Sequence, residues 1–278
     1  MKASPVKEIA EGVWVFRSRF AEMLSTLVAV GGGRGILVDP PMFAPEAEAI
    51  RRLAEREGIT ITWLAITHAH GDHAYGMVHF PEALVVTHQR FWGFWKEIEA
   101  EDRAFFARYL PSYSPPELRE PNIRFAEELE LVLQRRLTLT HAPGHTPDGI
   151  TVELSQERIL IAGDTVLRIP FISSGRIREL RSTLEGLLKD FGEGLLVLGH
   201  GDVVKGKEAR DLLEDNIRYL ERLENEVREA VRLGEGLEEV ERIPLRDFGI
   251  PEGAVGGLAA WIHRENLRAA YRELSQRG

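Results

Sequence analysis

Short apolar runs separated by turn residues dominate the first two thirds of this 278-residue chain. A largely apolar run over 24–30 is followed by three glycines and by a second run over 35–38. Two such runs around a glycine turn predict a β-hairpin. A longer run over 59–67 leads directly into His68. Further short strands are predicted at 84–86, 131–133, 137–140, 150–154, 159–162 and 195–198.

Helical signals lie between these runs. Pro45 opens a short helix that ends at Gly58. Ser182, with Glu185 three residues later, forms a capping box, which predicts the start of another helix. The first half and middle of the chain therefore alternate strands with helices, which is typical of an α/β protein.

The strand pattern stops near residue 205. Apolar residues then recur at three- and four-residue steps over 213–231, which predicts one face of a long amphipathic helix. A last helix is predicted over 255–274. We therefore expect a main domain over 1–205 and a helical C-terminal extension over 206–278, packed on the domain.

An aromatic-rich stretch over 89–120 differs from the strands around it. Seven aromatic side chains crowd into a helical pattern, and four prolines follow. We interpret the stretch as a helical insertion. Two roles remain open for it, because its aromatic residues suit both core packing and the lining of an apolar substrate pocket.

Composition narrows the chemistry. The chain has no cysteine, which excludes disulfides, thiolate metal ligands and cysteine nucleophiles. The net charge of −9 argues against a nucleic-acid partner.

No apolar run approaches the length of a membrane span and the start does not resemble a signal peptide, so we expect a cytoplasmic protein without a membrane partner. Arginine outnumbers lysine by 29 to 6, which fits a thermophile or, equally, a GC-rich source.

The strongest chemical signal is a cluster of three histidines and an aspartate. His68, His70, Asp72 and His73 lie within six residues, directly after a predicted strand. Histidines at i and i+2 point the same way on extended backbone, and Gly71 permits a turn after them. Loops at strand ends are where functional sites are commonly built. The cluster therefore predicts a metal site with nitrogen and oxygen ligands.

Three further candidate ligands also follow predicted strands. They are His145, Asp164 and His200, each preceded by a glycine. Because several strand ends can converge at one edge of a fold, we expect these side chains to join the cluster. His79, His88, His141 and His263 lie outside this pattern, and we expect them to be structural.

The HAHGDH motif at 68–73, together with His145, Asp164, His200 and an early Asp39, resembles the metallo-β-lactamase superfamily over residues 10–205. The resemblance implies an α/β fold: a four-layer αβ/βα sandwich of two mixed β-sheets flanked by helices. It also implies an enzyme, a metallo-hydrolase of the glyoxalase II-like group.

The same resemblance implies a ligand for each position. His68, His70 and His145 would hold a first metal ion, and Asp72, His73 and His200 a second. Asp164 would bridge the two ions, and Asp39 would support the loop by hydrogen bonds. We expect two divalent cations, zinc first, with iron and manganese as alternatives. Asp72 would be the catalytic residue that orients a bridging hydroxide.

Three activities remain open. The leading hypothesis is hydrolysis of a small ester, thioester or lactone at a dinuclear site. The alternatives are a mononuclear iron persulfide dioxygenase and a metal-dependent nuclease or phosphodiesterase. The expected partner is a small-molecule substrate, and homodimer formation is one role considered for the helical extension.

Overall fold

The computed structural model describes residues 6–251 and 253–275. The chain forms two compact units. The first contains the chain up to His141, with Asp148–Gly163 and Leu196–Val203. The second contains Ala142–Pro147, Asp164–Leu195 and the chain from Val204 onward. The chain thus crosses between the units several times, and the domain boundary at residues 205 and 206 stays a prediction.

A seven-stranded mixed sheet in the first unit carries the histidine cluster. Its strands follow one another in chain order: β1 (Val6–Ala10), β2 (Val13–Arg17), β3 (Leu24–Gly31), β4 (Arg34–Val38), β5 (Thr60–Ala65), β6 (Leu84–His88) and β7 (Ile123–Phe125). Pairing is antiparallel from β1 to β4 and parallel from β4 to β7. The predicted hairpin is β3–β4. Its three turn glycines all have positive φ, a conformation that glycine adopts without strain.

The second sheet has six strands in the order β13-β12-β11-β10-β9-β8. They are β8 (Glu128–Val132), β9 (Arg136–His141), β10 (Ile150–Leu154), β11 (Ile159–Ile161), β12 (Leu195–Val197) and β13 (Val203–Lys205). Arg135, in the β8–β9 turn, ties this sheet to the first one. Its guanidinium donates to the carbonyls of Ala29, at 2.9 Å, and Glu11, at 2.8 Å.

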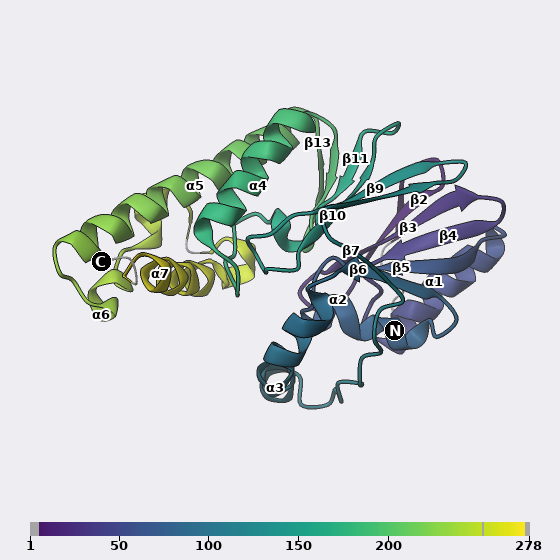
Figure 1. Ribbon diagram of the computed structural model, residues 1–278, viewed down its shortest axis with the longest axis horizontal. Helices are drawn as coiled ribbons and strands as arrows, with labels where there is room; N and C mark the ends of the chain where they lie inside the picture. Colours follow the sequence, from purple (N-terminus) through teal and green to yellow (C-terminus); the bar gives the residue numbers. More distant parts are fainter. Residues whose placement is uncertain (1–5, 252, 276–278) are drawn as a thin grey trace. The chain divides into compact units, whose positions relative to one another are not determined.

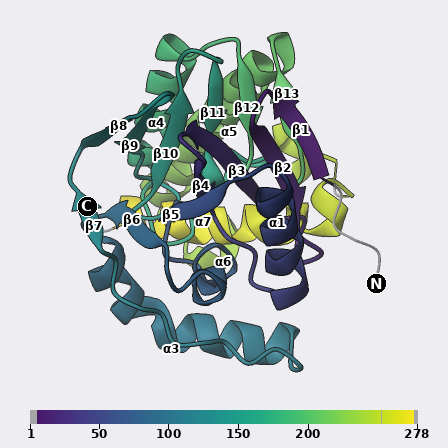
Figure 2. The same ribbon diagram turned by 90° about the vertical axis from the view of Figure 1, so that its right-hand side faces the viewer.

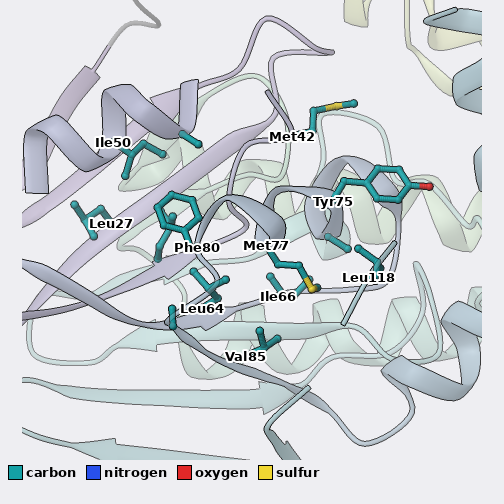
Figure 3. Close-up of a cluster of buried hydrophobic side chains, with 14 of the residues drawn as sticks. Leu27, Met42, Ile50, Leu64, Ile66, Tyr75, Met77, Phe80, Val85 and Leu118 are labelled. Carbon is teal, nitrogen blue, oxygen red and sulfur yellow. The ribbon is translucent and has the colours of Figure 1, made fainter. Parts of the chain in front are cut away.

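A hydrophobic core lies on one face of the first sheet, against α1 (Ala44–Arg56) and the segment after the histidine cluster (Figures 1 and 3). Leu27 and Leu64 come from the sheet, Ile50 from α1, and Met77 from the 3₁₀ helix η1 (Tyr75–His79). All four side chains are fully buried. The core therefore anchors both sides of the loop that carries the histidines.

The aromatic stretch forms helix α3 (Phe91–Tyr109), which lies outside the two sheets (Figure 2). Four of its aromatic side chains are buried and belong to the core: Phe91, Phe94, Trp95 and Phe106. Phe105 and Tyr109 are exposed. The four buried aromatic residues therefore fill the core-packing role. Residues 110–122 return to β7 without a helix or strand.

Helices make up most of the second unit: α4 (Ile177–Asp190), α5 (Lys207–Arg232), α6 (Leu237–Val240) and α7 (Ala259–Ser275), with short 3₁₀ turns η3 (Leu245–Phe248) and η4 (Val255–Gly257). Helices α4 and α5 lie side by side (Figure 1). Between them, buried Glu224 of α5 binds Arg178 and Arg181 of α4. No helix in the described ranges is long and apolar enough to cross a membrane.

Two helix starts differ from the sequence prediction. Helix α4 begins at Ile177, so Ser182 lies inside it rather than at its cap. Buried Ile177 and Leu180 extend the apolar face that continues at Leu184, and this packing outweighs the capping signal. The last helix begins at Ala259, since the turn before it contains glycines with positive φ.

Candidate metal centre

The histidine cluster begins three residues after the end of β5 and continues into the short helix α2 (Gly71–Ala74). His68 and His73 are buried, whereas His70 and Asp72 keep partial exposure. The His68 Nε2 and His70 Nδ1 atoms lie 2.9 Å apart. The i and i+2 spacing thus brings two imidazole nitrogens together, as the sequence predicts.

A second group of donors forms around His200, which follows β12. The Nε2 atoms of His73 and His200 are 3.3 Å apart, and Asp72 Oδ2 lies 3.3 Å from the His200 nitrogen and 3.8 Å from the His73 nitrogen. Donors bound to one tetrahedral zinc ion at 2.0–2.1 Å are about 3.3 Å apart. Asp72, His73 and His200 therefore fit a single divalent cation, with all three donors in the first unit.

Asp39 connects His68 of the first group of donors to His73 of the second. Its carboxylate accepts hydrogen bonds from the Thr67 amide at 2.8 Å, the Thr67 hydroxyl at 2.7 Å and His73 Nδ1 at 2.9 Å. The Thr67 hydroxyl, having donated its proton to Asp39, accepts from His68 Nδ1 at 3.0 Å. Both rings therefore carry the proton on Nδ1 and direct the Nε2 lone pair toward a metal. The supporting role expected for Asp39 has this physical basis.

His200 is oriented by a turn that sequence reasoning did not single out. Its Nδ1 donates to the carbonyl of Ala21 at 2.9 Å, and the loop pairs with Met23 in an isolated β-bridge. Ala21 and Glu22 both have positive φ, which is uncommon for residues with a side chain. The turn is therefore strained, and in this conformation it presents the Ala21 carbonyl to the candidate ligand His200.

In the second unit, His145 and Asp164 form another pair of candidate ligands. Both side chains are buried, and His145 Nε2 lies 3.5 Å from Asp164 Oδ2. His145 Nδ1 donates to the Phe171 carbonyl at 2.7 Å, which again leaves Nε2 for a metal. Gly144 has a φ of 136° and packs against the backbone of Leu180, so that only glycine fits beside His145.

An aromatic path leads away from His145 within the same unit. The centroid of the Phe171 ring lies 5.5 Å from that of the His145 ring and 5.4 Å from that of the Trp261 indole on α7. Trp261 is 45% exposed, and Leu258 beside it on the chain is also exposed. This apolar surface begins next to a candidate metal ligand.

Asp102 of α3 is a further residue at the loop that sequence reasoning missed. It accepts hydrogen bonds from Gly71 N–H and from the Tyr75 hydroxyl. Burial, with a smaller effect of the Asp72 charge, raises the pKa of Asp102 to about 6 against the lowering effect of these two bonds. Burial and the hydrogen bond that the Tyr75 hydroxyl donates to Asp102 raise the pKa of Tyr75, so this phenol stays protonated at neutral pH.

The structure therefore groups the seven sequence-predicted ligands as follows: His68 with His70, Asp72 with His73 and His200, and His145 with Asp164. Their neutral imidazoles and carboxylates suit a divalent cation. Three other histidines bond to main-chain carbonyls, as structural histidines do: His79 to Met42, His88 to Ala126 and His263 to Ile243.

Sequence comparison finds a family and several relatives for this chain. Residues 23–234 match the family model described as the metallo-beta-lactamase superfamily. A hydroxyacylglutathione hydrolase from Xanthomonas oryzae pv. oryzae is 28% identical over 174 residues, covering 60% of this chain and 56% of that protein. A beta-lactamase-like protein 2 homolog from Caenorhabditis elegans is 23% identical over 216 residues, covering 75% and 64%. The match spans less than two thirds of each of these two relatives.

Solved structures show the same fold. A stereoselective inverting sec-alkylsulfatase from Pseudomonas sp. aligns over 97% of this chain and 50% of its own, with a TM-score of 0.77 and 15% identity. A metallo-beta-lactamase from Pontibacter korlensis aligns over 78% and 99%, with a TM-score of 0.60 and 19% identity. The predicted fold class, two mixed sheets flanked by helices, is confirmed.

Proposed function

Because this chain belongs to the metallo-beta-lactamase superfamily, we propose that it is a metal-dependent hydrolase of small esters, thioesters or lactones. The superfamily predicted from the HAHGDH motif is confirmed. The hydrolase named among the relatives supports the predicted metallo-hydrolase class. The substrate and the number of metal ions belong to the proposal.

The observation that carries the proposal is the orientation of the imidazoles. His68, His73, His145 and His200 each have Nδ1 fixed by a hydrogen bond within their own unit, so each presents Nε2 as a donor. In His79, His88 and His263 the bond to a main-chain carbonyl is made by Nε2 instead, which leaves that atom unavailable to a metal. We propose His68, His70 and His145 as ligands of one ion, Asp72, His73 and His200 as ligands of another, and Asp164 as the bridge.

Divalent ions held by these residues would supply activated water at neutral pH and stabilise negative charge on the substrate. The chain's own groups supply orientation. Asp72 keeps a partly exposed carboxylate among the imidazoles, and we propose that it accepts a hydrogen bond from the attacking water. Asp39 and Thr67 keep the ligand rings in one tautomer throughout the reaction.

The surroundings of His145 favour a substrate with an apolar arm. Phe171 and Trp261 extend an aromatic surface from its ring, and aromatic faces bind acyl or alkyl chains through buried apolar area. The net charge of −9 disfavours polyanionic substrates such as RNA. We therefore propose a neutral or weakly charged small molecule as substrate, zinc as the metal, and the cytoplasm as the location.

The test is hydrolysis of a panel of p-nitrophenyl esters, acyl thioesters and lactones by zinc-loaded protein. The expected result is turnover of at least one class, lost in His70→Ala together with bound metal and retained in His79→Gln, which replaces a histidine bonded to Met42. Protein that holds its metal and cleaves none of the panel would overturn the proposal.

The alternative activities give different outcomes in the same preparation. One iron per chain with oxygen consumption on glutathione persulfide would identify a dioxygenase. Metal-dependent cleavage of single-stranded RNA, lost in Asp72→Ala, would identify a nuclease. Either result without ester, thioester or lactone turnover contradicts the proposed hydrolase.

A further inference from the structure

Asp102 lies on α3, 31 residues beyond Gly71, yet its carboxylate binds the histidine loop at two points. Oδ1 accepts from the Gly71 amide at 3.0 Å, and Oδ2 accepts from the Tyr75 hydroxyl at 2.6 Å. Gly71 lies between the proposed ligands His70 and Asp72. One side chain from a distant helix therefore holds the main chain in the middle of the ligand sequence.

Local structure alone does not provide this bond. Gly71 is the first residue of α2, and the first amides of a helix have no acceptor within the helix. His70 occupies the N-cap position but makes no capping bond, because its ring faces His68. A Cβ on Gly71 would collide with the Tyr75 ring and the Asp102 carboxylate. The glycine thus makes room for a cap supplied from α3.

Helix α3 is itself held in place, so it can transmit position to the loop. Arg103, the next residue, donates to the carbonyls of Pro115 at 2.8 Å and Pro116 at 3.0 Å. The Tyr75 ring packs edge-on against buried Trp95 of the same helix, with centroids 5.7 Å apart. The two contacts fix the helix on either side of Asp102.

We infer that Asp102 is a positioning residue for the metal site: it fixes the backbone between His70 and Asp72 so that ligands on both sides of Gly71 meet their metal ions. The inference rests on the proposed function, because it requires that these residues bind metal. Removing an outer hydrogen-bond partner of a metal site weakens metal binding by about 10–100-fold. We expect a loss of that size when both Asp102 bonds are removed.

The test compares zinc affinity by competition with a chromophoric chelator, at a temperature where every variant is folded by circular dichroism. Asp102→Ala removes both acceptors, and Asp102→Asn keeps the shape and one acceptor oxygen. Glu101→Ala is the matched control, because Glu101 is the exposed neighbour on the same helix. We expect zinc affinity to be highest, and equal, in the wild type and Glu101→Ala, lower in Asp102→Asn and lowest in Asp102→Ala.

A merely structural role for Asp102 gives a different result. In that case the Asp102 variants melt at lower temperature but bind zinc as the wild type does, and this overturns the inference alone. If Asp102→Ala does not fold, Asp102→Asn decides between the two outcomes. Wild-type protein that binds no divalent ion overturns the proposed function and the inference together.

Discussion

At the scale of single residues, Asp39 offers the sharpest test of how the ligands are oriented. It is buried at the end of β4, and its carboxylate accepts three hydrogen bonds from Thr67 and His73. Asp39→Asn keeps the volume but replaces one acceptor oxygen with a donor. Either the Thr67 amide loses its acceptor, or the Thr67 hydroxyl and His73 Nδ1 both lose theirs. We predict zinc affinity about 10–100-fold weaker, measured by chelator competition.

The matched control for Asp39 is Asp202→Asn. Asp202 is a half-exposed aspartate two residues after His200, and it binds Arg17 at 3.0 Å. Losing an exposed ion pair of this kind leaves affinity within about twofold. Equal affinities for Asp39→Asn and the wild type would contradict the role assigned to the buried carboxylate.

We expect the buried His88 to account for part of the loss of folding stability at acidic pH. Burial, with a smaller effect of stacked His141, lowers the pKa of His88 from 6.5 to about 4. Its Nε2 donates to the Ala126 carbonyl and its Nδ1 accepts from the Arg90 amide, so a second proton would break the latter bond. Between pH 6.5 and 4 the unfolded chain binds one more proton here than the folded chain, so stability falls as pH falls.

The measurement for His88 is urea unfolding of His88→Gln and the wild type from pH 7 to pH 4. Glutamine keeps a donor for Ala126 but does not titrate. We predict that the variant loses stability more slowly on acidification, by up to about 1.4 kcal/mol per pH unit. Parallel stability curves for the two proteins would contradict the lowered pKa.

The candidate ligands could be predicted from the sequence because their pattern is local. His68, His70, Asp72 and His73 lie within six residues after a strand. Asp102 could not be predicted, because its contact with the loop spans 31 residues and depends on how α3 packs. The carbonyl that orients His200 belongs to Ala21, and a main-chain acceptor has no signature in residue type.

At the scale of elements, predictability followed the strength of the repeating pattern. Helix α5 was predicted because its apolar residues recur over many turns, and its buried face includes Leu213, Leu220 and Val227. Strands β1 and β13 were not predicted: both are short, and neither shows a clear apolar alternation. Edge strands of this kind are defined by their pairing partners more than by their own sequence.

Helix α7 carries a prediction about substrate preference. Trp261 presents half-exposed aromatic surface that continues from Phe171 and His145. We predict that Trp261→Ala lowers kcat/KM for esters with long acyl chains by about tenfold relative to acetyl esters, because the lost apolar contact is worth roughly 1–2 kcal/mol. Steady-state kinetics over a series of p-nitrophenyl esters measures the ratio.

The control for Trp261 is Leu233→Ala, which removes a similarly exposed apolar side chain at the end of α5 in the same unit. It should leave the chain-length preference unchanged. Equal losses for short and long esters in Trp261→Ala would show that the indole stabilises α7 without touching the acyl chain.

At the scale of the whole molecule, the metal ions couple the site to the stability of the protein. The donor residues come from segments far apart in the chain, from His68 to His200, so the unfolded chain binds metal much more weakly than the folded one. A ligand that binds only the folded state stabilises it by about 2.7 kcal/mol at 100 times its dissociation constant. Removing the ions should therefore lower the unfolding temperature.

The measurement is thermal unfolding of protein as purified, after chelation, and after zinc is restored, alongside elemental analysis. We predict about two divalent ions per chain, a lower unfolding temperature after chelation, and recovery with zinc. In His70→Ala the chelator should have a smaller effect, because part of the stabilisation is already lost. If chelation leaves the unfolding temperature unchanged, the histidines and carboxylates stabilise this fold through their hydrogen bonds alone.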